Sequence, residues 1–141
     1  MTREESAKLL ALIKVAYPTA YRDMDGDMIQ ATVNMWQVSF PGVPYVIMQM
    51  AFDRFRKVSK FPPTVAEMIE QLQNLHWAAT FEANAAMSIG DNDKYRRCEY
   101  IMSHTSRYSD IGSELGFNII SEETLLEHER YKMIGDGEHG Q

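Results

Sequence analysis

Residues 60–67, Lys-Phe-Pro-Pro-Thr-Val-Ala-Glu, decide how this chain folds. Two consecutive prolines cannot continue a helix, and Pro63 disfavours helical backbone at the residue before it. Thr64 is followed three residues later by Glu67, which is the capping-box pattern. In a capping box, each side chain accepts a hydrogen bond from a backbone N–H that the first helical turn leaves unpaired. The stretch therefore predicts that one helix ends near residue 59 and that the next helix begins directly after Thr64.

Phe61 stands immediately before this turn. A large apolar side chain beside a polar turn suggests contact with a hydrophobic core. We therefore expect Phe61 to be buried.

Apolar residues at spacings of three and four predict further helices on both sides of the corner. Thr2 and Glu5 form another capping box, and Pro18 ends the helix that they open. This first helix has a broad apolar face, and the third expected helix is apolar nearly all round at its start, which is typical of the buried helix of a bundle. The other expected helices run from about residue 27 to 40, over 43–58, from 65 into the segment 83–87, over 94–104, and from 121 onward.

The fold class that follows is all-α: a small bundle of about four helices with an additional helical C-terminal arm. The sequence Ile-Gly-Asp-Asn-Asp at 89–93 is the best candidate boundary. We expect an N-terminal helical domain over 1–88, and an acidic helical arm with a flexible end over 89–141.

The composition is that of a soluble globular protein, with 45% hydrophobic and 24% charged residues among 141. No apolar run approaches the roughly 20 residues that cross a bilayer. The first residues lack the basic start and apolar centre of a secretory signal. Cys98 is alone, which excludes an internal disulfide and fits a reducing compartment. We therefore expect a cytoplasmic protein without a membrane segment.

The net charge of −6 is unevenly distributed. Residues 1–76 carry 8 basic and 8 acidic side chains, whereas 77–141 carry 6 basic and 12 acidic ones. An acidic chain is repelled by phosphate, so direct binding of nucleic acid is not expected. A basic surface on a protein partner would be attracted to the second half.

The acidic run Asp-Met-Asp-Gly-Asp at 23–27 resembles the opening of a calcium-binding loop. An EF-hand needs glycine at its sixth position and glutamate at its twelfth, and Met28 and Asn34 stand there instead. The run therefore predicts a turn with helix-capping carboxylates in preference to a metal site.

No catalytic, cofactor-binding or metal-ligating set emerges from the sequence, so we do not expect an enzyme. Phosphate-binding loops, nucleophile elbows and paired-carboxylate signatures are missing. Arg96 and Arg97 could lower the pKa of the neighbouring Cys98 thiol, but no general base is placed beside it. The histidines have no ligand spacing, and we expect each to be exposed or hydrogen-bonded singly: His76, His104, His128 and His139.

The end of the third expected helix is a possible basic patch, made of Arg54, Arg56, Lys57 and Lys60. These side chains could face phosphate or pair with the acidic arm. They lack the interleaved aromatic residues that stack on bases, so a solvated face is the better interpretation. We expect the two tryptophans to be core or seam anchors: Trp36 and Trp77.

The first half resembles the helicase loader and inhibitor family encoded by phages of Gram-positive bacteria. The resemblance covers about residues 1–75 and rests on these residues in this order: Glu4-Glu5, Leu9-Leu10, Ile13, Tyr17-Pro18, Val33-x-x-Trp36-x-x-x-Phe40 and Lys60-Phe61-Pro62-Pro63-Thr64. It implies a small helical N-terminal domain with a C-terminal part that folds little by itself. It also implies a non-catalytic protein that binds a hexameric DnaB-type replicative helicase in the bacterial host cell, holds it inactive and delivers it to an origin.

The arm is the expected helicase-binding element. Its apolar side chains would be buried on the partner, while its acidic side chains would steer the encounter. The expected partner-binding residues are Ile119, Ile120, Leu125, Leu126, Tyr131, Glu122, Glu123 and Glu127.

The acid-rich second half also leaves open an alternative of another class. A phage inhibitor of a host nucleic-acid-binding defence protein, of the anti-CRISPR or DNA-mimic type, would imitate the charge of phosphate. Its binding would be lost to added DNA and would weaken steeply with salt.

Overall fold

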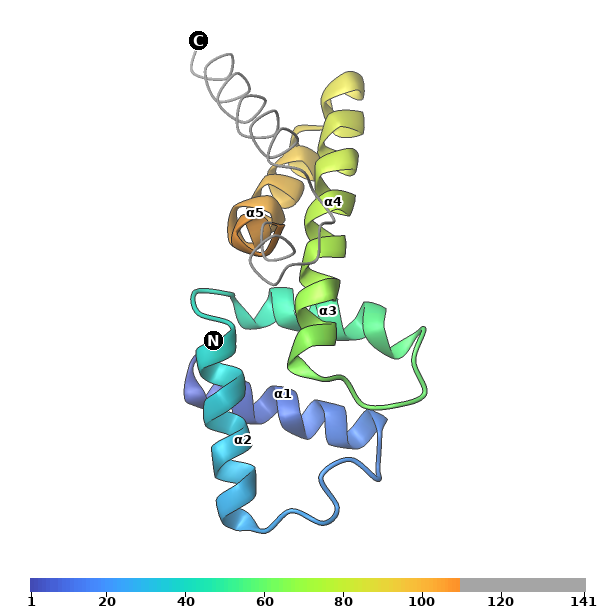
Figure 1. The fold of residues 1–141 in the computed structure, drawn as a ribbon. Coiled ribbons are helices and arrows are strands. Elements are labelled where there is room, and N and C mark those ends of the chain that lie inside the picture. Colours follow the sequence, from blue (N-terminus) through green and yellow to red (C-terminus); the bar gives the residue numbers. More distant parts are fainter. Residues whose placement is uncertain (110–141) are drawn as a thin grey trace. The chain divides into compact units, whose positions relative to one another are not determined.

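In a computed structural model, the structure describes residues 1–109. This part forms five helices and no strand, which confirms the all-α class for the described residues (Figure 1). The helices are α1 (Arg3–Ala16), α2 (Gly26–Ser39), α3 (Tyr45–Arg56), α4 (Val65–Ile89) and α5 (Asn92–Ser109). The chain divides into two compact units, Met1–Ser106 and Arg107–Gln141, and the packing described below is that of the first unit. The division into a domain of 1–88 and an arm of 89–141 stays a prediction.

The helix starts follow the predicted caps. In α1 the Thr2 hydroxyl accepts from the Glu5 N–H at 3.1 Å, and the Glu5 carboxylate accepts from the Thr2 N–H at 2.9 Å. The hydrogen bond from the Thr2 backbone holds the pKa of Glu5 below its usual value. In α2 the Asp25 carboxylate accepts from the Met28 N–H at 2.8 Å, which confirms that the run at 23–27 caps a helix.

Helices α1 and α3 run in the same direction (Figure 1). One hydrogen bond joins the segments where the two helices start, and another joins the segments where they end. At their starts, the Met1 amino group donates to the Val43 carbonyl at 2.9 Å. At their ends, the Tyr17 hydroxyl donates to the Ser59 carbonyl at 2.8 Å. The Tyr17 ring also lies against Phe52 and Phe55, with centroids 6.3 and 6.5 Å away.

Helix α3 contacts both α1 and α4, as expected of the buried helix of the bundle. Its buried side chains are Ile47, Met48, Ala51, Phe52 and Phe55. On the other side of α1, the buried Ser6 hydroxyl donates to the Val33 carbonyl at 3.0 Å and so ties α1 to α2. Trp36 of α2 is buried, which confirms it as a core anchor.

The backbone of the corner between α3 and α4 forms as predicted, but the Phe61 side chain does not lie where the sequence predicted. Thr64 and Glu67 make the reciprocal capping box, and α4 begins at Val65. Phe61, however, is 77% exposed, so the prediction that it is buried was wrong. The Ser59 hydroxyl bonds both the N–H and the C=O of Phe61 and fixes the turn locally. The buried aromatic residue that reaches this corner is Tyr17 of the chain after α1, whose hydroxyl donates to the Ser59 carbonyl.

Beyond the corner, α4 and α5 form a hairpin. Gly90 ends α4 with a left-handed φ of 75°, a conformation that costs glycine little. Asp91 accepts from the Lys94 N–H at 3.1 Å and starts α5 two residues earlier than predicted. The two helices meet through one small apolar cluster, which comprises Ala79, Ala83, Cys98, Tyr95, Ile101 and Met102.

The hairpin also has polar links. Lys94 of α5 pairs with Glu82 of α4 at 2.6 Å. The Thr105 hydroxyl donates to the Ile101 carbonyl at 2.7 Å, so it accepts from the buried His76 Nδ1–H at 3.1 Å. Of the two outcomes expected for each histidine, exposed or hydrogen-bonded, His76 therefore has the second and is buried.

Removing the Thr64 hydroxyl should weaken the corner. We expect Thr64→Ala to lower the free energy of unfolding by about 1 kcal/mol, because the Glu67 N–H loses its acceptor. Thr32→Ala is the control, since Thr32 is a partly buried mid-helix residue whose hydroxyl donates to the Met28 carbonyl and the Met24 sulfur and caps no helix start. Denaturant unfolding measures both variants. Equal stability changes would contradict the capping role of Thr64.

Two tyrosines allow a second comparison. Tyr17→Phe removes the bond to the Ser59 carbonyl and should cost about 1 kcal/mol of unfolding free energy. Within residues 1–109 the buried Tyr21 hydroxyl has no hydrogen-bond partner, so Tyr21→Phe should leave stability unchanged or raise it slightly. Thermal and denaturant unfolding measure both. A loss at Tyr21 as large as that at Tyr17 would contradict this account.

Candidate protein-docking groove

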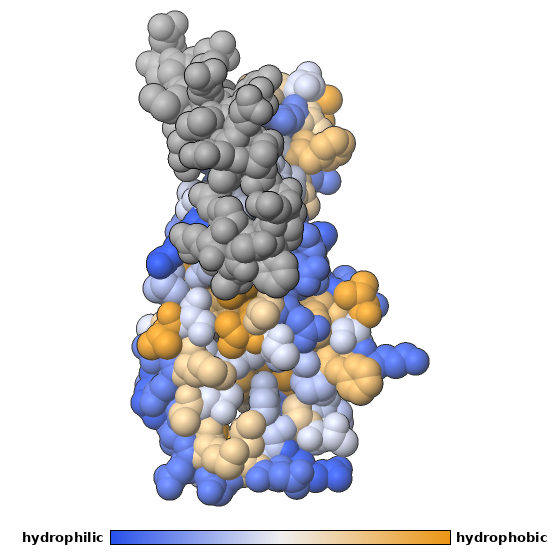
Figure 2. Space-filling view, in the orientation of Figure 1, coloured by the Kyte–Doolittle hydropathy of each residue, from blue (hydrophilic) through white to orange (hydrophobic). Residues whose placement is uncertain are grey.

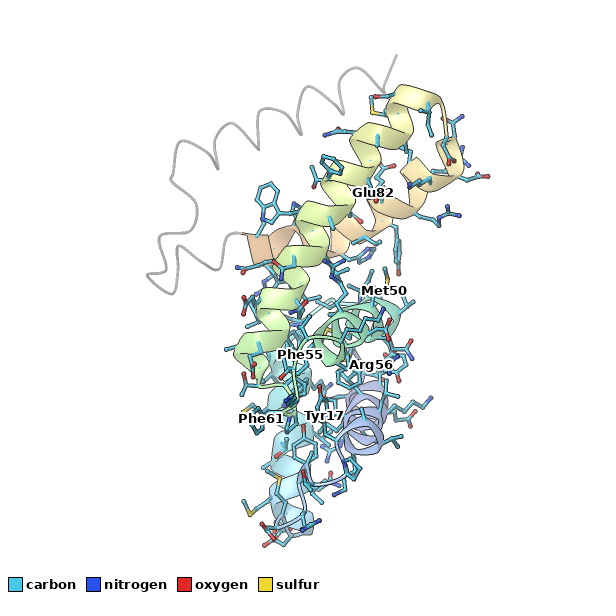
Figure 3. The ribbon with its side chains drawn as sticks, turned by 90° about the vertical axis from the view of Figure 1, so that its right-hand side faces the viewer. Tyr17, Met50, Phe55, Arg56, Phe61 and Glu82 are labelled. Atoms are coloured by element: carbon cyan, nitrogen blue, oxygen red, sulfur yellow. The ribbon has the colours of Figure 1, made fainter. Side chains whose placement is uncertain are left out.

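Helices α1 and α3 leave an open groove of about 670 Å³ between their outer faces. Figure 3 shows Met50 and Arg56 on this part of α3, with Tyr17 between Arg56 and Phe61 in that view. The groove is lined by Leu12, Val15, Ala16, Val46, Gln49, Met50, Phe52, Asp53 and Arg56.

The groove exists because both helices carry more apolar side chains than the core can bury. On α1, Leu9 and Ile13 are fully buried, while Leu12 and Val15 of the same broad apolar face remain exposed. On α3, the outer side chains facing them include Val46, which is also exposed. Phe52 is buried beneath and forms the floor.

The exposed apolar side chains of Leu12, Val15 and Val46 line one pocket, which distinguishes them from scattered ones. Single exposed apolar residues are normal on soluble proteins, and the face drawn in Figure 2 mixes apolar (orange) with polar (blue) side chains. A contiguous apolar surface with a polar rim is typical of a site for a protein or ligand. The rim here is Gln49, Asp53 and Arg56.

The charged end of the groove is organised by one carboxylate. Asp53 pairs with Arg56 at 2.7 Å and with Lys57 at 3.4 Å. The hydrogen bond from Arg56 lowers the pKa of Asp53, and the Lys57 charge acts in the same direction. All these groups are solvent-exposed at least in part, so the pairs orient side chains more than they add stability.

The structure thus divides the predicted basic patch. Arg56 and Lys57 share Asp53, whereas Arg54 and Lys60 have no ion-pair partner in the part of the chain that the structure describes. Binding by this patch stays a prediction.

The other sequence candidates lie away from the groove. Cys98 is buried in the α4–α5 cluster, and burial raises the pKa of its thiol. The Arg97 charge does lower the pKa of Cys98, which the sequence allowed, but removing the thiol from water outweighs the lowering charges of Lys94 and Arg97. Trp77 is partly exposed on α4.

The described residues contain neither a candidate metal site nor a candidate membrane-spanning helix. No group of three or more His, Cys, Asp or Glu side chains within 1–109 could hold a metal ion. No helix in the same part of the chain is both long and apolar enough to cross a membrane.

The predicted partner-binding residues of the arm lie outside the described residues. They are Ile119, Ile120, Leu125, Leu126, Tyr131, Glu122, Glu123 and Glu127. Sequence reasoning missed the groove, although the width of the apolar face on α1 was a usable signal for it.

A family model for the N-terminal domain of a phage helicase loader/inhibitor matches residues 1–69. Residues 1–69 are therefore similar to the N-terminal domain of this family. The family resemblance of the first half is therefore confirmed. The matched segment, called the loader domain for this similarity, ends in the second turn of α4 and contains every residue that lines the groove. No curated protein and no solved structure shows significant similarity to the chain.

Burial should make Cys98 a slow nucleophile. We expect alkylation of Cys98 at about pH 8 to be at least roughly tenfold slower in the folded protein than in denaturant, because the thiolate is the reacting form. Free cysteine alkylated under both conditions is the control. Equal rates for the folded and the denatured protein would contradict a raised pKa and a buried sulfur.

Proposed function

We propose that this chain is a non-catalytic phage protein that binds a DnaB-type replicative helicase in the host cytoplasm and loads or inhibits it. The observation that carries the proposal is the loader domain over residues 1–69. Proteins of this family are helicase loader/inhibitors, which supports a protein partner of this kind.

The described structure suits a binding role. The α1/α3 groove is apolar with a polar rim, which fits a macromolecular contact. Binding that prefers one arrangement of helicase subunits would shift their equilibrium toward that arrangement and slow ATP turnover.

The arm supplies a second element of the proposal. Its apolar side chains are proposed to be buried on the helicase and its acidic ones to steer the encounter, as the composition of this segment suggests. The central pair is Leu125 and Leu126.

The test is to mix the purified protein with the helicase of the phage or its host. We expect co-migration in size-exclusion chromatography, dependence on the nucleotide state of the helicase, and a lower rate of ATP hydrolysis. No co-migration together with an unchanged ATPase rate would overturn the proposal. Displacement of the bound protein by added duplex DNA would indicate a phosphate imitator instead.

Arm variants locate the contact. Leu125→Asp combined with Leu126→Asp should weaken helicase binding at least roughly tenfold, since two apolar side chains that are proposed to be buried on the helicase become charged. His139→Ala, in the same arm but outside the proposed set, is the control. Equal affinities of the two proteins would show that the arm pair is not part of the interface.

A further inference from the structure

We infer that the α1/α3 groove receives an apolar helix of the helicase, and that this helix carries acidic side chains where it passes the Arg56 end. The inference rests on the proposed function and names the surface and the partner chemistry that would serve it. The groove lies within the loader domain, whereas the proposed arm contact lies outside the described residues.

The length of the groove fits a short helix. Its lining on α3 extends from Val46 to Arg56, ten residues apart, which corresponds to about 15 Å along a helix axis. A helix of two to three turns spans this distance and presents apolar anchors at spacings of three and four. Helix-in-groove recognition has this form.

The walls of the groove supply apolar surface that water covers in the free protein. Val15 is 78% exposed and Val46 is 50% exposed, and Leu12 is also part of the lining. Covering this surface with an apolar helix removes it from water, which is favourable in proportion to the area. A nucleic acid strand would place charged phosphates against the same aliphatic side chains and would gain nothing from them.

The positive charge at the Arg56 end of the groove favours acidic side chains on the docked helix. Residues 53–67 carry four cations, Arg54, Arg56, Lys57 and Lys60, against the carboxylates Asp53 and Glu67. This leaves a positive surplus in the segment that contains Arg56 of the groove rim, on a chain whose total charge is −6. Asp53 holds Arg56 at the rim, so a second carboxylate from the partner would find a guanidinium already oriented. An acidic side chain on the docked helix is therefore favoured there and a basic one is disfavoured.

The groove is also preformed. Its floor, Phe52, is part of the core, and its two walls are fixed to each other by the Tyr17–Ser59 bond at one end and the Met1–Val43 bond at the other. A preformed surface has less conformational freedom to lose on binding.

The experiment compares variants of the full chain in equilibrium binding to the helicase. Val15→Arg and Val46→Arg each place a charge in the groove at an exposed position, so the fold is retained. Val38→Arg on α2, 73% exposed and outside the groove, is the matched control. We expect each groove variant to weaken binding at least roughly tenfold and the control to change it less than about twofold. Groove variants that bind as well as Val38→Arg overturn the inference and leave helicase binding by the chain intact.

A charge-reversed double variant tests the chemistry of the partner. Arg56→Glu with Lys57→Glu should weaken helicase binding and reduce its dependence on salt between about 50 and about 200 mM. Unchanged affinity and salt dependence would contradict an acidic partner helix. The same variant is tested with a fluorescent single-stranded oligonucleotide. If the original chain binds the oligonucleotide and the double variant does not, the surface is a nucleic-acid site and the inference is overturned.

The two proposals fail differently. If the original chain does not bind the helicase, the proposed function is wrong, and the inference falls with it. If the original chain binds and only the arm variants lose affinity, the function stands and the groove is not the contact.

Discussion

The structure depends on the way that both ends of α1 are fastened to the matching ends of α3. The Tyr17 hydroxyl reaches the Ser59 carbonyl at 2.8 Å, and the Met1 amino group reaches the Val43 carbonyl at 2.9 Å. Two such bonds define a parallel pair with a fixed spacing. The Tyr17 ring lies against α3, so the hydrogen bond and the apolar contact act at the same point.

The fixed spacing of α1 and α3 determines which of their faces remain exposed for contact with other molecules. Helices held in parallel bury one face against each other and against their neighbours, α2 on α1 and α4 on α3. The remaining faces cannot turn inward, because the buried positions are already filled by residues such as Ile13 and Phe52. The apolar side chains left over on α1 and α3 therefore line a groove, and Arg56, one of the cations at the end of α3, lies at its rim. The same cations are favoured by the negative end of the α3 dipole, so their position has a local cause as well as a proposed use.

Sequence reasoning succeeded where the deciding contact lies within one helical turn. The caps at Thr64 and Asp25 involve residues three apart, so the pattern itself contains both partners. It failed where the decision depends on residues far along the chain. Phe61 is exposed, whereas Tyr17, 44 residues earlier, is the buried ring bonded to Ser59 at this corner. The pKa of Cys98 follows from burial against α4, and its neighbours in sequence cannot reveal that burial. The groove required knowledge of which helices are parallel, which no single helix pattern supplies.

The length of helix α4 determines how far its outer end moves when its base tilts. It runs unbroken from Val65 to Ile89 without proline or glycine, about 37 Å in length, yet only its first residues belong to the loader domain (Figure 1). Its base is seated on α3, and its far end bears the turn at Gly90. Such a rod acts as a lever: a tilt of about 10° at the base would displace the far end by roughly 6 Å for a helix of this length. A ligand that changed the angle at which α4 packs on α3 would thus produce a larger displacement at the Gly90 end of the α4–α5 hairpin than at the base of α4.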